Sequence, residues 1–193
     1  MKFELIIDSR PSEVVIALLR DQRLIELHKE QNNNSYSVGD IYIGKVKKVV
    51  PGLNAAFVNV GHEKDGFLHY LDLGPNIGSY QKYTDRAISK KSNTASLKNF
   101  RKSKVIEKSG LITDVLKSGD HIMVQVSKEA ISSKGPRLTA EISIAGRNMV
   151  LLPFSNKISL SNKIRSQEEK VRLKRLLKSI KPEGFGIIVR TVA

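Results

Sequence analysis

Cysteine and tryptophan are absent from this chain of 193 residues, and it contains no long run of apolar residues. Without cysteine the chain forms neither disulfides nor thiolate zinc sites. The histidines are His28, His62, His69 and His121. They share no metal-ligand spacing, so we expect no metal ion here. Because a transmembrane helix needs about 20 apolar residues and the amino terminus lacks a signal-like apolar segment, we expect a cytoplasmic protein that does not bind membranes.

Acidic residues are also fewer than basic residues. The chain has 33 Lys and Arg against 19 Asp and Glu, which gives a formal net charge of +14. Residues 75–110 hold nine basic against two acidic side chains, and residues 162–181 hold eight against two. Two basic blocks on an otherwise balanced chain predict a polyanionic partner. The plainer alternative is a solvated linker and a solvated helix face.

The amino-terminal segment has the pattern of three short antiparallel strands. β-Branched and aliphatic residues cluster at 3–8, 13–19 and 24–27, with a tight turn at 20–23. We expect apolar positions such as Ile6 and Ile25 to form a small core. The polar segment QNNNSYS follows and predicts a domain boundary, since it has little to bury.

Residues 39–73 alternate apolar and polar side chains with period two, interrupted at Pro51-Gly52 and at the charged turn HEKDG. This pattern predicts a meander of short strands. A later strand, HIMVQVSKE, follows another turn and would close the sheet on itself. The pattern predicts an α+β, mostly β chain built on a five-stranded OB-type barrel, a common platform for single-stranded nucleic acid.

Strand alternation also predicts which side chains leave the barrel. If Val58 points inward, Phe57 points outward, and Phe67 and His69 share one face of the next strand. Outward aromatic rings stack on bases, so we expect these three residues to contact RNA. We expect Tyr42 and Lys45 on the first barrel strand to extend this surface. The alternative is that either Phe plugs the end of the barrel.

The rest of the chain predicts a loop, a strand pair and a helix. Residues 74–110 are rich in Ser, Asn and Lys without a sustained period, so we expect this long basic loop to be disordered or only partly helical. Residues 139–144 and 149–152 read as paired strands that join the amino-terminal strands in one sheet. A capping box at Ser166 opens a helix whose apolar residues have i, i+3, i+4, i+7 spacing. These are Leu173, Leu176, Leu177 and Ile180.

Several motifs occur in one order across nearly the whole chain: GDIYIGKV, PGLNAAFVNVG, KGPRLTAEISIAGR and GIIVRTVA. The first two resemble an S1-type RNA-binding domain, and the combination resembles the amino-terminal half of the ribonuclease E/G family. The resemblance implies an RNase H-like subdomain split into residues 1–37 and 139–193. An S1-type OB barrel at residues 38–138, with its long loop at 74–110, would interrupt it.

The resemblance also implies functional residues. The family's aromatic residues at the positions of Phe57 and Phe67 contact RNA, and Lys134 matches an RNA-contacting lysine. A pocket that senses a 5′-monophosphate is implied at Gly146, Val150, Lys163, Arg190 and Thr191. Where the best-known family members carry adjacent arginines, this chain has Asn162-Lys163. Lysine offers a point charge and not a bidentate fork, so we expect weaker phosphate discrimination.

Family members cut RNA with two aspartates that hold a magnesium ion, and some dimerise through a zinc link. Both features lie downstream of the matching region, so we expect the full-length parent to be a Mg-dependent, oligomeric endoribonuclease in RNA processing. This chain alone should bind single-stranded RNA without cleaving it and without a cofactor. One alternative is a non-catalytic S1-type RNA-binding factor in translation or ribosome assembly. A third possibility is a scaffold whose basic blocks bind a protein or membrane surface.

Overall fold

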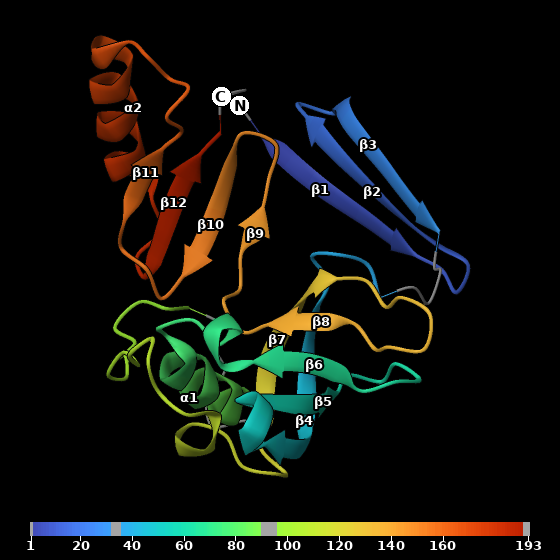
Figure 1. Ribbon diagram of the computed structural model, residues 1–193. Helices are drawn as coiled ribbons and strands as arrows, with labels where there is room; N and C mark the ends of the chain where they lie inside the picture. Colours follow the sequence, from blue (N-terminus) through green and yellow to red (C-terminus); the bar gives the residue numbers. More distant parts are fainter. Residues whose placement is uncertain (1, 32–35, 90–95, 191–193) are drawn as a thin grey trace. The chain divides into compact units, whose positions relative to one another are not determined.

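The computed structural model describes residues 2–31, 36–89 and 96–190, and the chain divides into two compact units, residues 1–35 and 36–193 (Figure 1). Each unit is described by itself. The strands are β1 (Phe3–Ser9), β2 (Glu13–Arg20), β3 (Arg23–Gln31), β4 (Ile41–Val50), β5 (Ala55–Asn59), β6 (Gly66–His69), β7 (His121–Lys128), β8 (Arg137–Thr139), β9 (Ile144–Ala145), β10 (Met149–Pro153), β11 (Ile158–Leu160) and β12 (Phe185–Val189). The helices are α1 (Ile77–Ile88) and α2 (Gln167–Ile180), with short 3₁₀ turns η1 (Pro51–Leu53), η2 (Tyr70–Asp72) and η3 (Ile112–Asp114).

The first unit is an antiparallel sheet in the order β1-β2-β3. Asp21 and Gln22 have φ angles of 48° and 66°, the left-handed pair that a two-residue hairpin turn requires. The three predicted strands and their tight turn are therefore confirmed. The predicted small core is wrong for the described residues, since none of them in this unit is buried and Ile6 and Ile25 are 53% and 48% exposed.

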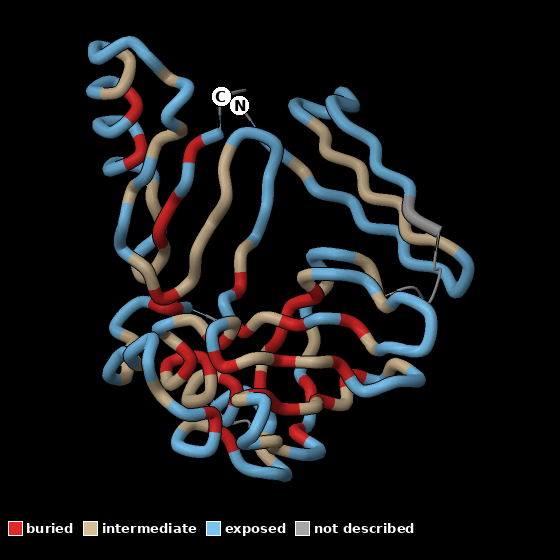
Figure 2. The backbone as a smooth tube through the Cα atoms, viewed as in Figure 1, coloured by how far each residue is buried: buried red, intermediate tan, exposed pale blue. Residues whose placement is uncertain are grey.

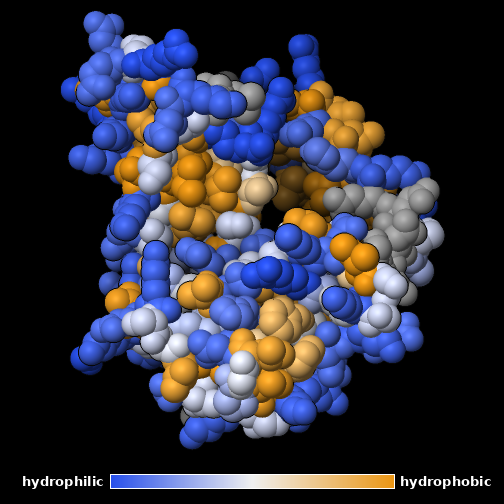
Figure 3. Space-filling model, in the orientation of Figure 1, coloured by the Kyte–Doolittle hydropathy of each residue, from blue (hydrophilic) through white to orange (hydrophobic). Residues whose placement is uncertain are grey.

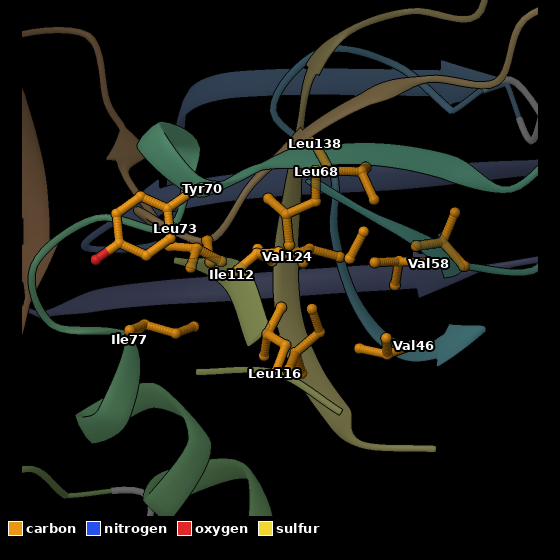
Figure 4. Close-up of a cluster of buried hydrophobic side chains, with 14 of the residues drawn as sticks. Val46, Val58, Leu68, Tyr70, Leu73, Ile77, Ile112, Leu116, Val124 and Leu138 are labelled. Atoms are coloured by element: carbon orange, nitrogen blue, oxygen red, sulfur yellow. The ribbon is translucent and has the colours of Figure 1, made fainter. Parts of the chain in front are cut away.

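The second unit contains a closed barrel with strand order β4-β5-β6-β8-β7, which confirms the mostly β, OB-like class. Alternation sends one set of side chains inward on every strand, where they form the main core (Figure 4). This set includes Val46, Val58, Leu68, Val124 and Leu138. Gly44 lies on the inner side of β4, where a Cβ would come within 2.5 Å of Val58. Glycine at this position lets β4 and β5 approach closely.

The barrel ends one strand later than expected. Residues 137–139 form β8, which lies between β6 and β7 and completes the ring. The predicted strand at 139–144 is therefore mostly absent, and only Ile144–Ala145 pairs with β10. The reason is that the short β8 fills the gap between β6 and β7, so the chain leaves the barrel only after Thr139.

The long insertion is more ordered than its composition indicates. Residues 77–88 form α1, which packs on β7, and residues 96–111 fold back beside this helix. Ser79 is fully buried, and its Oγ accepts the N–H of Ser103 at 3.0 Å, while Ser103 Oγ donates to the Gly78 carbonyl. Tyr80 and Phe154 meet edge to face with ring centroids 4.7 Å apart. These contacts fix the described parts of the segment, where one helix, α1, is followed by non-helical chain. Of the two expectations, the partly helical one is therefore confirmed for the described residues, and disorder is not.

A four-stranded sheet in the order β11-β12-β10-β9 completes the second unit, with α2 packed on one face. Ser166 Oγ accepts the N–H of Glu169 at 3.2 Å, which confirms the predicted helix cap. Leu173 and Leu177 are buried against the sheet. Leu176 and Ile180, 46% and 56% exposed, lie outside this contact, so the predicted apolar stripe is narrower than expected.

That this sheet joins β1–β3, which belong to the other compact unit, stays a prediction. Apart from the closed barrel, the described residues form a three-stranded sheet and a four-stranded sheet. Neither described helix is long and apolar enough to cross a membrane.

Candidate nucleic-acid interface

Two phenylalanines lie side by side on the outer face of the barrel. Phe57 on β5 and Phe67 on β6 are direct cross-strand partners, with ring centroids 5.8 Å apart and ring planes at 67°. Both are partly exposed, whereas their neighbours Val58 and Leu68 are fully buried. The alternation predicted from the sequence is confirmed, and neither ring plugs the barrel. An outward aromatic pair on adjacent strands provides a surface on which bases can stack.

Cationic side chains flank this pair on both sides. Lys48 on β4 is the cross-strand partner of Phe57, and Arg137 on β8 is the partner of Phe67. Lys45, which the sequence singled out, lies farther along β4 opposite Asn59. Arg137 is oriented by Asp72, whose Oδ2 accepts from Nη2 at 2.8 Å and from Nε at 3.1 Å.

Lys48 and Arg137 were missed by the sequence analysis. The ladder between β4 and β5 shifts register between Val46 and Lys48, a bulge that inserts one unpaired residue. Beyond the bulge, counting alternate residues from Lys45 therefore no longer identifies the side chains that point outward. Arg137 reaches the face only through the parallel pairing of β6 with β8, which joins residues far apart in the chain.

His69 lies at the end of β6, two residues after Phe67, and it is partly exposed. Its Nδ1 accepts the backbone N–H of Leu71 at 3.1 Å. In the neutral imidazole the proton then resides on Nε2, which is left as a donor. The predicted grouping of His69 with the two phenylalanines is reproduced by the strand geometry.

Tyr42 does not extend this face. It lies on β4 with the opposite parity to Lys45, packs against the barrel core and stacks on Tyr36 with centroids 5.0 Å apart. Its hydroxyl donates to Asp40 Oδ2 at 3.2 Å. Burial, followed by the negative charge of Asp40, raises the pKa of Tyr42 to about 12. Residues 42 and 45 are an odd number of positions apart, so one strand cannot present both outward.

Lys134 projects from the loop between β7 and β8 and is exposed. The following Pro136 carbonyl accepts the N–H of Phe67 at 2.8 Å. A Cβ on Gly135 would lie 2.1 Å from the Asp65 carbonyl oxygen, so only glycine fits this approach to the β5–β6 turn. The loop is thus tied to the start of β6, with Lys134 two residues before the Pro136 carbonyl that accepts from Phe67.

The predicted 5′-phosphate residues gather at one end of the four-stranded sheet. Arg190 follows β12, and its Nη1 donates to the Gly146 carbonyl in the β9–β10 turn at 3.2 Å. Val150 is the cross-strand partner of Ile188, on the same face of the sheet as Arg190. Among the described residues no carboxylate pairs with Arg190. Thr191 lies outside the described residues.

Lys163 approaches this end from the other neighbour of β12. It is exposed in the turn after β11, where Ser161 N–H donates to the Val189 carbonyl at 3.0 Å. Its own backbone N–H donates to Ser161 Oγ at 3.4 Å. Two turns, one carrying Gly146 and one carrying Lys163, therefore flank the end of β12 from which Arg190 extends.

Acidic and imidazole side chains form no cluster of three that could hold a metal ion anywhere in residues 2–31, 36–89 and 96–190. The absence of a metal site from this chain stays a prediction.

The chain resembles known proteins along most of its length. The Ribonuclease E/G family model matches residues 143–193. The chain is 36% identical to ribonuclease E of Synechocystis over 190 residues, which is 95% of this chain and 24% of that protein. It is 35% identical to ribonuclease G of Haemophilus influenzae over 188 residues, 97% of this chain and 34% of that protein.

A further relative is ribonuclease G of Escherichia coli, 32% identical over 193 residues, which is 100% of this chain and 36% of that protein. The chain therefore spans between about a quarter and about a third of the length of these relatives. The family model, the curated relatives and the barrel agree with the motifs of the sequence. This chain belongs to the ribonuclease E/G family.

Proposed function

We propose that this chain binds single-stranded RNA and senses its 5′ end, as the amino-terminal portion of an endoribonuclease in RNA processing and decay. The observation that carries the proposal is the outward pair Phe57 and Phe67, flanked by Lys48 and Arg137. Bases stack on the rings while the flanking cations lie near the phosphates. Stacking is tolerant of sequence, so the bound strand is selected by being unpaired more than by its bases.

The end of β12 supports the second half of the proposal. Within the described residues, the Arg190 guanidinium donates to the Gly146 carbonyl, which orients the group and leaves other N–H donors for a ligand. A guanidinium fork suits a terminal phosphate, and Lys163 adds a positive charge on the other flank. The exposed Asn162 carries no charge where family members have an arginine. We therefore expect a preference for a 5′-monophosphate of only several-fold.

We propose that the residues that cleave RNA lie in the part of the family's sequence that this chain does not span. The family chemistry calls for two aspartates around a magnesium ion, and the resemblance places both aspartates downstream of the matching region. We propose that the whole protein is a Mg-dependent, oligomeric nuclease and that this portion alone binds RNA without cutting it.

The test is a fluorescence-anisotropy titration with a short single-stranded RNA in moderate salt. We expect Phe57→Ala and Phe67→Ala each to weaken binding by about 5- to 150-fold, since one stacked base is worth about 1–3 kcal/mol. The matched control is Phe3→Ala, which removes an exposed phenylalanine from the first unit and should leave affinity unchanged. RNA binding that is unaffected by both barrel variants would contradict the stacking proposal.

End sensing is tested with the same RNA carrying a 5′-monophosphate or a 5′-hydroxyl. We expect the monophosphate to bind several-fold tighter and Arg190→Ala to erase the difference. Arg147→Ala provides a control, because Arg147 is an exposed arginine in the same turn as Gly146. A different result is that the unaltered chain binds both RNAs equally, with Phe57→Ala and Phe67→Ala still reducing both affinities. That result favours the alternative of an RNA-binding factor without end sensing.

A further inference from the structure

Two cationic side chains approach the ring of Phe100, on the segment that folds back along α1. Three further basic residues accompany them, since Arg101 and Lys102 follow Phe100 directly and Lys181 lies close to Lys102. Lys82 Nζ lies 5.5 Å and Arg86 Cζ 5.1 Å from the centroid of the Phe100 ring. Lys82 Nζ also donates to the Arg101 carbonyl at 2.9 Å, which fixes the segment against the helix. We call this group the Phe100 cluster: Lys82, Arg86, Arg101, Lys102 and Lys181.

The positive charge of the Phe100 cluster is not neutralised within the described part of the chain. None of its five members forms an ion pair there. Lys181 follows α2, and its Nζ donates to the Phe185 carbonyl at 2.9 Å, a neutral acceptor. Burial, and next the positive charge of Lys181, lower the pKa of Lys102. Two lysines that repel one another, neither of them in an ion pair within the described residues, form a favourable place for an anion.

The Phe100 cluster lies on a different side of the barrel from the aromatic pair. α1 packs against β7 (Figure 1). Tyr80 and Tyr83 of α1 belong to the same apolar cluster as Met123 of β7, whose side chain points out of the barrel. In the closed order β4-β5-β6-β8-β7, strand β7 is separated from β5 by β4 and from β6 by β8. A ligand that covers only Phe57 and Phe67 does not reach this side.

The chemistry of the Phe100 cluster fits phosphates better than bases. The Phe100 ring is approached by two cations and also packs on Phe154, with centroids 5.1 Å apart, so its faces are largely occupied. Ammonium and guanidinium groups remain for ligands, and these bind phosphate oxygens without reading sequence.

Basic residues of α2 lead towards the Phe100 cluster. Lys174, Lys178 and Lys181 recur at helical spacing, so Lys174 and Lys178 lie about 6 Å apart along the axis. The outer surface of α2 is largely hydrophilic in Figure 3. A row of lysines that ends at Lys181 extends the cluster into a track along which a polyanion can lie.

We propose that the Phe100 cluster binds the phosphodiester backbone of the RNA chain whose bases stack on Phe57 and Phe67, several nucleotides away along the strand. The inference rests on the proposed RNA-binding function and adds a second contact that depends on RNA length and not on sequence. Once the aromatic pair has bound, the second contact forms within one complex, so its effective concentration is high and a modest local affinity suffices.

The experiment compares two single-stranded RNAs of one composition, about 6 and about 24 nucleotides long, binding to the unaltered chain and to Lys102→Gln/Lys181→Gln. The control is Lys2→Gln/Lys29→Gln, which removes the same net charge from lysines already paired with Glu4 and Glu13. We expect the cluster variant to bind the long RNA about tenfold more weakly and the short RNA unchanged. For the long RNA, the slope of log association constant against log salt concentration should become shallower by about 1.4, since each phosphate contact on a single strand contributes about 0.7.

A result in which the cluster variant and the control behave alike on the long RNA overturns the inference. The inference is also overturned if the cluster variant binds both RNAs more weakly by the same factor, which would indicate a general effect of lost charge. Phe57→Ala separates the two proposals. If Phe57→Ala weakens the binding of both RNAs while the cluster variant changes the binding of neither, only the proposed second contact is wrong. If the unaltered chain binds neither RNA, both proposals fail.

A second measurement needs no variant. Amine-reactive labelling of the unaltered chain should show Lys102 and Lys181 protected by the long RNA and not by the short one. Lys2 and Lys29 serve as internal references whose labelling should stay constant. Unchanged labelling of Lys102 and Lys181 at saturating long RNA would overturn the inference even if the variant failed to fold.

Discussion

The barrel and the three-stranded sheet of residues 1–35 use the same alternation of apolar and polar residues and reach opposite states of burial. On the barrel, Val58 and Leu68 are fully buried. On the sheet, Leu5 and Leu27 remain 62% and 58% exposed. Figure 2 shows buried segments along the barrel strands, whereas the described residues of β1–β3 are exposed or intermediate.

The difference shows what strand patterning alone provides. Alternation sorts side chains to two faces, but a face is removed from water only if the sheet closes on itself or another layer covers it. The barrel closes through β8, so its inner face becomes a core. Among the described residues the first unit offers three strands and no covering helix. Its apolar side chains therefore contribute little to stability by burial within this unit.

Amide hydrogen exchange should give the largest contrast between the two regions. Amides in β5 and β6 lie in a closed ladder over a buried core, so they should exchange only when the barrel unfolds. We expect them to be at least ~100-fold slower than the amides of β1 and β3 that pair with β2. Equal protection in both regions would mean that the first sheet is shielded in solution and would break the comparison.

Leu68→Ala should destabilise the chain by about 2–5 kcal/mol, because it leaves a cavity at a fully buried position in the barrel. Urea unfolding monitored by circular dichroism gives the change in free energy of unfolding. A loss below about 1 kcal/mol would show that the barrel core relaxes around the missing side chain and is less rigid than its packing implies.

Asn54→Ala should cost about 1–3 kcal/mol. The Asn54 side chain donates to the Gly110 carbonyl at 3.1 Å and accepts the N–H of Ile112 at 2.7 Å, so it ties the β4–β5 turn to the end of the insertion. Its φ of 47° adds a preference for asparagine over alanine. Asn162→Ala, at an exposed position, should change the same unfolding curve by less than about 0.5 kcal/mol. Equal effects of the two variants would argue against the tie.

Leu27→Ala should have the smallest effect, within about 0.5 kcal/mol, because the side chain is already 58% exposed. It makes the same substitution as Leu68→Ala, so the two variants differ only in burial. A loss above about 2 kcal/mol would show that Leu27 is covered in solution.

Much of the fold and of the aromatic face could be predicted from the sequence. Period-two alternation is a local property, and it located the barrel strands and the outward side chains Phe57, Phe67 and His69. The cap at Ser166 was equally local, since its partner Glu169 is three residues away. The family resemblance added Gly146 and Arg190, which the structure joins by a hydrogen bond.

Non-local features could not be predicted. The bulge in β4 changes which residue lies opposite Phe57, and the position of β8 depends on pairing with β6. Partial helicity was expected in this segment, but α1 could not be located because Ser79 and Thr84 are buried polar residues, so its buried face does not look apolar in the sequence. Tyr42 was assigned to the outer face together with Lys45, although residues an odd number of positions apart on one strand point to opposite faces.

The parallel pairing of Phe67 with Arg137 has a consequence for how the protein is made. A ribosome that adds about 5–20 residues per second needs roughly 4 to 14 seconds to pass from the first residue to the second. During that interval β5 and β6 are already synthesised while the edge that β8 will occupy is open. An open strand edge invites mispairing with other nascent chains. Slow translation between these residues should therefore lower the yield of folded protein more than slow translation after them.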